Sequence, residues 1–233
     1  MVEQGGARRV EKTTRALTPT EWMRERFKGI LYVGAAFFVR RGLHPNTMTL
    51  LGLAGNIAGA IFLAFGWMTT GGLIILLSGP VDALDGSMAR ILKQPTRFGA
   101  FVDSVTDRWS ETLIFMGLLY YYLQRNEVWA CLLVFAATVG SVMVSYTKAR
   151  AEGTGFDCNV GILTRMERYL VLAPLLIFRQ PLWAVAVIAV LANFTALQRA
   201  AYVRAQALRQ LKEARSTLGG EGLAPTFMEE KHL

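Results

Sequence analysis

Residues 48–68 read MTLLGLAGNIAGAIFLAFGWM and carry no charged side chain. A helix that crosses the hydrocarbon core of a bilayer needs about 20 mostly apolar residues, so this stretch predicts a transmembrane helix. Further apolar runs cover residues 71–89, 99–123, 128–147, 169–178 and 182–197. We therefore expect an all-α integral membrane protein with six transmembrane helices. The fifth span reaches full length only if it begins near Ile162.

The composition supports this class. Charged residues make up 18% of the chain, against about 25% in soluble domains. Of the 25 Lys and Arg residues, only Arg125 and Arg179 fall on one side of the predicted bundle. Because Lys and Arg concentrate in cytoplasmic loops, the net charge of +8 indicates orientation and not nucleic-acid binding. Both termini are then cytoplasmic. The two cysteines, Cys131 and Cys158, lie on separate segments and predict no disulfide.

The chain divides into four expected parts. Residues 1–18 form a flexible basic tail, and no apolar core of a signal peptide occurs in residues 1–28. Residues 19–42 end in a short apolar run and predict an N-terminal amphipathic interfacial helix. Residues 43–213 form the six-helix domain, and residues 214–233 form a flexible C-terminal tail.

Four acidic residues stand in or beside two of the apolar runs. Asp82 and Asp85 are three residues apart, and Asp103 and Asp107 are four apart, so each pair shares one helix face. The short connection makes the two helices antiparallel neighbours, which brings the four carboxylates together. Oxygen ligands with this charge suit hard divalent cations such as Mg²⁺. An acidic proton or cation pathway in a small transporter is the alternative that the pattern leaves open.

Asp82, Asp85, Gly86, Ala89, Arg90, Gly99, Asp103 and Asp107 follow the pattern D-x-x-D-G-x-x-A-R-(x8)-G-x-x-x-D-x-x-x-D. This pattern resembles the signature of the CDP-alcohol phosphatidyltransferase family, and the resemblance covers roughly residues 40–205. It implies a homodimeric enzyme of phospholipid biosynthesis, located in the plasma membrane of a prokaryote. The active site would open to the cytoplasm. The enzyme would transfer a phosphatidyl group from CDP-diacylglycerol to an alcohol and release CMP.

The resemblance also implies site residues. Asp82, Asp85 and Asp103 would bind two Mg²⁺ or Mn²⁺ ions. Asp107 would complete the metal site and act as the catalytic general base. The CDP-lipid would contact residues before the first span and around the motif, namely Pro45, Asn46, Thr47, Met48, Gly86, Arg90 and Thr96.

Basic residues after the fourth span predict the acceptor. Residues 145–153 read SYTKARAEG and resemble the prokaryotic phosphatidylinositol-phosphate synthase branch of the family. The resemblance implies that the phosphate of an inositol phosphate binds to Lys148, Arg150, Arg168 and Arg199. We attribute Arg165 and Arg204 to the positive-inside rule alone. Glycerol 3-phosphate also needs cations, so it stays open as an alternative acceptor.

Overall fold

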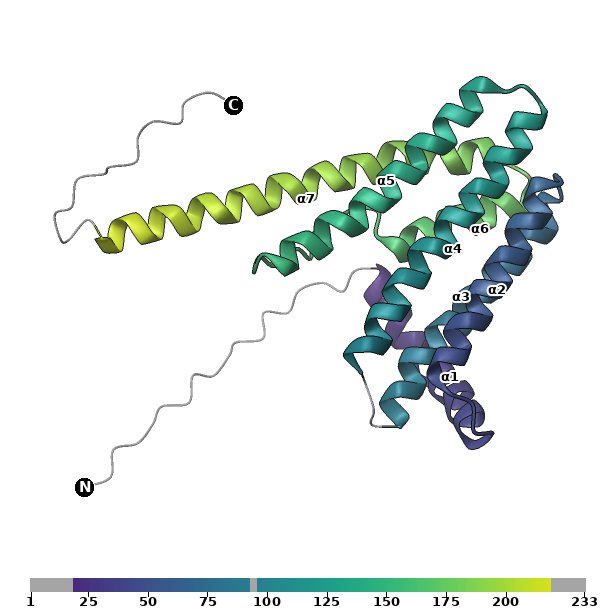
Figure 1. Cartoon of the computed structure of the whole chain (residues 1–233), viewed down its shortest axis with the longest axis horizontal. Coiled ribbons are helices and arrows are strands. Elements are labelled where there is room, and N and C mark those ends of the chain that lie inside the picture. Colours follow the sequence, from purple (N-terminus) through teal and green to yellow (C-terminus); the bar gives the residue numbers. More distant parts are fainter. Residues whose placement is uncertain (1–18, 93–95, 219–233) are drawn as a thin grey trace.

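The computed structural model describes residues 19–92 and 96–218, and every regular element in these ranges is an α-helix (Figure 1). In chain order the helices are α1 (Pro19–Arg40), α2 (Pro45–Ala64), α3 (Met68–Ile91), α4 (Arg97–Gln124), α5 (Val128–Gly153), α6 (Arg165–Ile177) and α7 (Pro181–Leu218). Helix α7 continues through 214–218, which we expected in the C-terminal tail, because residues 205–215 are almost all good helix formers. The expected tail 1–18 lies outside the described residues.

Within the described ranges, four helices are long and apolar enough to cross a membrane, namely α2, α3, α5 and α7. The predicted all-α membrane protein is therefore confirmed, whereas the count of six spans stays a prediction. Helix α4 has the length but carries several charged residues. Helix α6 has 13 residues, which extend about 20 Å, less than the apolar core of a bilayer. Cys131 and Cys158 are free, as expected.

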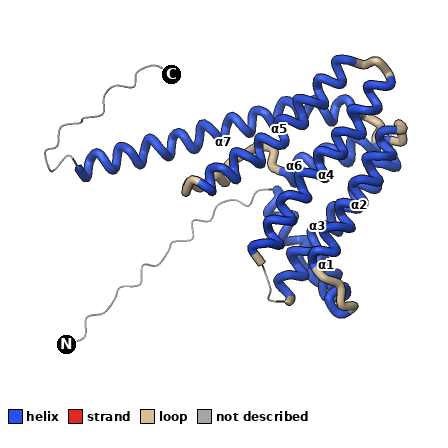
Figure 2. Tube along the Cα trace, in the orientation of Figure 1, coloured by secondary structure: helices blue, strands red, loops and turns tan. Residues whose placement is uncertain are grey.

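The short connections place the acidic motif at one end of the bundle. Figure 2 shows that the turns after α2, α4 and α6 gather at the end where α3 begins. Helix α3 runs away from this end and α4 returns to it, so the two are antiparallel. Asp82 and Asp85 therefore lie near the end of α3, beside Asp103 and Asp107 near the start of α4.

Glycines let α2 approach its two neighbours closely. A Cβ on Gly71 of α3 would lie 2.9 Å from the carbonyl oxygen of Gly59 on α2. A Cβ on Gly117 of α4 would lie 3.0 Å from the carbonyl carbon of Ala60 and would overlap its oxygen. Small residues at such crossings are typical of helix packing in membranes. The close approach holds α2 against α3 and α4 in the half of the bundle opposite the aspartates.

This packing predicts that Gly117→Ala destabilises the protein by about 1–3 kcal/mol, as other overpacked sites do. The backbone of α2 cannot move away without disturbing its contacts with α3. Gly153→Ala is the matched control, because a Cβ on Gly153 meets nothing within 4 Å. The midpoint of thermal unfolding in detergent measures both variants. Equal midpoints for the two would contradict the close contact.

Helix α1 packs on the acidic end of the bundle. Its Ala35 is fully buried in a small cluster with Met48, Leu84 and Met88. The apolar side chains of Tyr32, Val33 and Phe37 are instead exposed. Helix α1 thus contacts the start of α2 and the end of α3, and presents a second apolar face to the surroundings.

Candidate active site

Three aspartates of the motif meet where α3 ends and α4 begins. One carboxylate oxygen each from Asp82, Asp85 and Asp103 lies within 4.8 Å of the other two. Asp82 and Asp85 are buried, and Asp103 is half-buried. Carboxylates this close and this buried repel one another unless cations or hydrogen bonds compensate their charge. The structure thus brings together three of the four aspartates that the spacing predicted to converge.

Helix α2 shapes the side of the cluster that faces it. Thr49 Oγ1 donates a hydrogen bond of 2.5 Å to Asp85 Oδ2, and the Gly86 N–H donates to Oδ1 of the same carboxylate. Gly52 lies against Asp82, since a Cβ there would be 3.1 Å from Asp82 Oδ1. Helix α2 therefore orients the side chain of Asp85 through Thr49 and leaves room for the side chain of Asp82 at Gly52. The motif spacing indicated neither contact.

Asp107 lies one turn further along α4 and pairs with α6. Arg165 Nη1 is 2.5 Å from Asp107 Oδ2, and Arg165 Nη2 is 2.7 Å from Asp82 Oδ2. One guanidinium therefore bridges two aspartates of the motif. The other oxygen of Asp107, Oδ1, is buried and has no hydrogen-bond partner among the described residues.

A buried ion pair fixes the start of α6. Arg168 is 1% exposed, and its guanidinium donates to both carboxylate oxygens of Glu111, at 2.6 and 2.9 Å. It also donates to the Leu163 carbonyl at 3.2 Å. The predicted role of Arg168 in acceptor binding stays a prediction, and the structure gives the residue a partner within the protein. Two-pronged contacts of this kind hold a guanidinium in one orientation.

The residues predicted to contact the CDP-lipid lie around the same end of the bundle. The segment 45–48 begins α2, with Met48 buried. Gly86 is exposed, and a Cβ there would meet nothing within 4 Å. Arg90 Nε donates to the Gly86 carbonyl at 3.0 Å. Thr96 caps α4 by accepting from the Gly99 N–H at 2.9 Å.

The other predicted acceptor residues lie on α5 and α7. Lys148 is half-exposed, 3.6 Å from Glu152 one turn later, and Arg150 is exposed. Arg199 is 5% exposed and donates to the carbonyls of Val160 and Val144. Arg199 therefore ties α7 to α5 and to the loop before α6. Its neighbours include Arg168, with which it interacts electrostatically, so the structure gathers two of the four predicted cations.

The donor set of the cluster fits a divalent cation. Asp82, Asp85 and Asp103 offer only carboxylate oxygens, which are the ligands that Mg²⁺ and Mn²⁺ prefer. Their oxygens are near enough to share one ion. Asp107 is outside this group of three, and its side chain pairs with Arg165.

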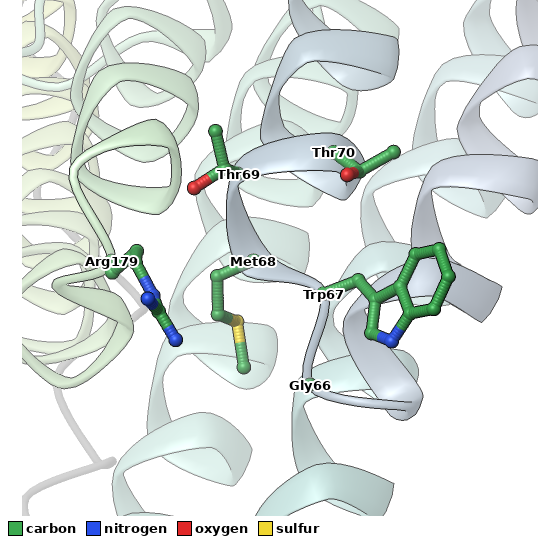
Figure 3. Close-up of a pocket in the computed structure, with 6 residues that line it drawn as sticks. All are labelled: Gly66, Trp67, Met68, Thr69, Thr70 and Arg179. Carbon is green, nitrogen blue, oxygen red and sulfur yellow. The ribbon is translucent and has the colours of Figure 1, made fainter.

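A separate hollow of about 230 Å³ lies at the opposite end of α3 (Figure 3). Its walls come from the turn between α2 and α3 and from Arg179 after α6. No carboxylate lines it, and the length of α3 separates it from the aspartates. Its residues offer no ligand set for a cation.

Comparison with known proteins decides the family. Residues 42–198 match the family model described as CDP-alcohol phosphatidyltransferase, which is about two thirds of the chain. The chain belongs to the CDP-alcohol phosphatidyltransferase family. The membership that the motif predicted is thus confirmed, and with it the assignment of the chain as an enzyme, a transferase of the membrane.

Curated relatives narrow the branch of the family. The phosphatidylinositol phosphate synthase of Streptomyces avermitilis is 41% identical over 168 residues, covering 67% of this chain and 68% of the relative. The archaetidylinositol phosphate synthase of Methanothermobacter thermautotrophicus is 37% identical over 173 residues, covering 70% and 85%. The predicted resemblance to the phosphatidylinositol-phosphate synthase branch is confirmed.

Solved structures share the fold. Phosphatidylinositol phosphate synthase (PgsA1) of Mycobacterium tuberculosis with CDP-DAG bound has a TM-score of 0.70 and 29% identity, covering 75% of this chain and 93% of that one. The same enzyme in complex with manganese and citrate has a TM-score of 0.68, again at 29% identity, covering 74% and 88%.

Sequence reasoning missed three residues that the structure places at the family's site. Arg165 was attributed to membrane orientation, although it lies one turn before Arg168 on the same face of α6. Glu111 extends the four-residue spacing of Asp103 and Asp107 by one more turn, and that signal could have found it. No sequence pattern pointed to Thr49, because its hydrogen bond to Asp85 depends on how α2 packs against α3.

Proposed function

We propose that the protein transfers the phosphatidyl group from CDP-diacylglycerol to an inositol phosphate, which releases CMP and gives phosphatidylinositol phosphate. The observation that carries this proposal is the group formed by Asp82, Asp85 and Asp103, with Asp107 one turn away. These carboxylates can bind the divalent cations that a transferase needs to neutralise a pyrophosphate. Relatives named as phosphatidylinositol or archaetidylinositol phosphate synthases support the acceptor.

Asp82, Asp85 and Asp103 hold divalent metal, with two Mg²⁺ ions per site and Mn²⁺ as a substitute. Bound there, the ions neutralise the pyrophosphate and the CMP that leaves. Thr49 and the Gly86 N–H fix the Asp85 carboxylate by hydrogen bonds to its two oxygens. The exposed backbone at Gly86 lets a phosphate come close, since a side chain there would occupy that space.

Asp107 is the general base. It takes the proton of the acceptor hydroxyl while the hydroxyl oxygen attacks the phosphorus that bears the diacylglycerol. The bond from that phosphorus to the CMP oxygen breaks, and CMP leaves with the bonding electrons. In such a displacement the protein positions the reactants and stabilises charge. Asp107 Oδ1 is buried and has no partner in the described part of the chain, and Asp107 Oδ2 is paired with Arg165.

The acceptor phosphate binds to cations near the ends of α5 and α6. Lys148 is partly exposed and Arg150 is exposed, so both can reach a solute, while Arg199 is buried and fixes the loop that precedes α6. Arg168 contributes positive charge from its buried position. A neutral acceptor would not use the charge of Arg150 and Arg199, for which the structure shows no ion pair in the described residues.

The membrane arrangement completes the proposal. Six spans run from α2 to α7, and α1 lies in the membrane interface with Tyr32, Val33 and Phe37 toward lipid. Both termini and the active site face the cytoplasm, because the basic segments lie on that side. The chain forms a homodimer, as the family resemblance implies.

The test is CMP release by the purified full-length protein with CDP-diacylglycerol and Mg²⁺. We expect release with inositol 1-phosphate and none above background with glycerol 3-phosphate or free inositol. Lys148→Ala should raise the KM for inositol 1-phosphate by about tenfold, the cost of one charge-assisted hydrogen bond, with little change in kcat. Release with glycerol 3-phosphate alone would overturn the acceptor and keep the aspartate chemistry. No binding of CDP-lipid would overturn the proposal.

A further inference from the structure

Arg165 makes the two shortest ion pairs to the motif aspartates. Its two terminal nitrogens lie 2.7 Å from Asp82 and 2.5 Å from Asp107. The side chains of Asp82 and Asp107 are 8% and 11% exposed and that of Arg165 is 39% exposed, so the carboxylates are shielded from water while the guanidinium keeps some contact with it. Hydrogen bonds between a charged guanidinium and a carboxylate are shorter and stronger than those between neutral groups.

The position of Arg165 is set by its neighbours on α6. Three residues later, Arg168 binds Glu111 of α4 through both carboxylate oxygens. One residue further, the Tyr169 hydroxyl lies 2.8 Å from Asn56 Oδ1 and 2.7 Å from the Ile75 carbonyl. The first turn of α6 is therefore anchored to α2, α3 and α4. This anchoring places the Arg165 guanidinium beside the aspartates. The packing of α6 therefore explains its position without the positive-inside rule.

The Arg165 guanidinium and a divalent cation would both bind the carboxylate of Asp82. Asp82 Oδ2 accepts from Arg165, and Asp82 is also one of the three residues that can hold a metal. A divalent ion at that carboxylate would stand near the positive guanidinium, where burial strengthens the repulsion. The two cations therefore oppose each other at this site.

We propose that Arg165 is a built-in counter-cation, which competes with the divalent metal for Asp82 and Asp107 and leaves them when the metal binds. The proposal rests on the proposed metal site. Departure of Arg165 exposes Asp107 Oδ2 and so couples loading of the metal to release of the general base. Arg165 is a positioning residue in this scheme, because it acts through Asp82 and Asp107.

The test is Mn²⁺ binding to the full-length protein in detergent, measured by electron paramagnetic resonance of free Mn²⁺. Arg165→Gln should tighten Mn²⁺ binding by about tenfold, which corresponds to the loss of one competing ion pair. Arg108→Gln is the matched control. Arg108 interacts electrostatically with Asp103 and donates to the Ser104 carbonyl, without an ion pair to a motif aspartate. The Arg108→Gln variant removes the same charge near the site. It should tighten Mn²⁺ binding by about twofold or less, because solvent and salt screen a charge that makes no direct contact with the aspartates.

Arg165→Lys keeps the charge but cannot contact both carboxylates at once, so its Mn²⁺ affinity should fall between those of the wild type and Arg165→Gln. This variant also keeps the test decisive if Arg165→Gln fails to fold. Arg165 variants that bind Mn²⁺ no more tightly than Arg108→Gln would overturn the competition while the metal site stands. Absence of Mn²⁺ binding in the wild type and in all variants would overturn the metal site together with the competition.

Discussion

Replacing Asp107 with asparagine is expected to lower the rate of CMP release by about a thousandfold, the usual contribution of a positioned general base. Asparagine has the same shape and keeps an oxygen that can accept from Arg165, so the fold should survive. It cannot take a proton from the acceptor hydroxyl. The measurement is CMP release at saturating inositol 1-phosphate, CDP-diacylglycerol and Mg²⁺.

The matched control for this prediction is Asp157→Asn. Asp157 lies exposed in the loop between α5 and α6, away from the aspartates of α3 and α4. Its variant should release CMP at the wild-type rate. The Asp107→Asn protein should still bind CDP-diacylglycerol, because Asp82, Asp85 and Asp103 are intact. Full activity of Asp107→Asn would show that another group removes the proton.

Replacing Glu111 with alanine is expected to destabilise the protein by about 3–5 kcal/mol, the cost of leaving one partner of a buried ion pair alone. Arg168 is 1% exposed, and its guanidinium would lose two hydrogen bonds that water cannot replace. The free energy of unfolding, measured by titration with sodium dodecyl sulfate in mixed micelles, checks the value.

A double variant separates the ion pair from the packing. Glu111→Leu combined with Arg168→Met removes both charges and keeps apolar volume, and such replacements are often neutral or stabilising. We expect it to be more stable than Glu111→Ala. A loss below about 1 kcal/mol in Glu111→Ala, the range of exposed pairs, would contradict the buried, two-pronged contact. The same double variant should lose activity with inositol 1-phosphate, because it removes the positive charge of Arg168 that we propose for acceptor binding.

Much of the fold could be predicted because its causes are local. Apolar runs near span length gave α2, α3, α5 and α7, and the structure has helices there. The polar side chains of α4 and the shortness of α6 weaken the same signal. A hydropathy scale scores how favourably a single segment enters lipid by itself. Helices α4 and α6 are stabilised largely by contacts with neighbouring helices, which such a scale does not include.

The candidate site shows the same division. Helical spacing alone placed Asp82 beside Asp85 and Asp103 beside Asp107, and a short connection brought the two pairs together. Spacing could not assign partners across helices. The predicted role of Arg168 in acceptor binding came from the family resemblance and stays a prediction, and the structure adds its ion pair with Glu111. Arg165 was attributed to the positive-inside rule, and the structure sets it between Asp82 and Asp107.

The amino-acid sequence by itself determined the membrane class, the acidic motif and the family, because each depends on residues close together in the chain. Only the tertiary structure decided which cation meets which carboxylate. That choice follows from how closely α2 approaches α3 at its glycines and from where the first turn of α6 is anchored. An ion pair forms only when two charged groups lie within a few ångströms of each other. Small differences in helix packing therefore decide which groups pair, although they do not change the hydropathy of the sequence.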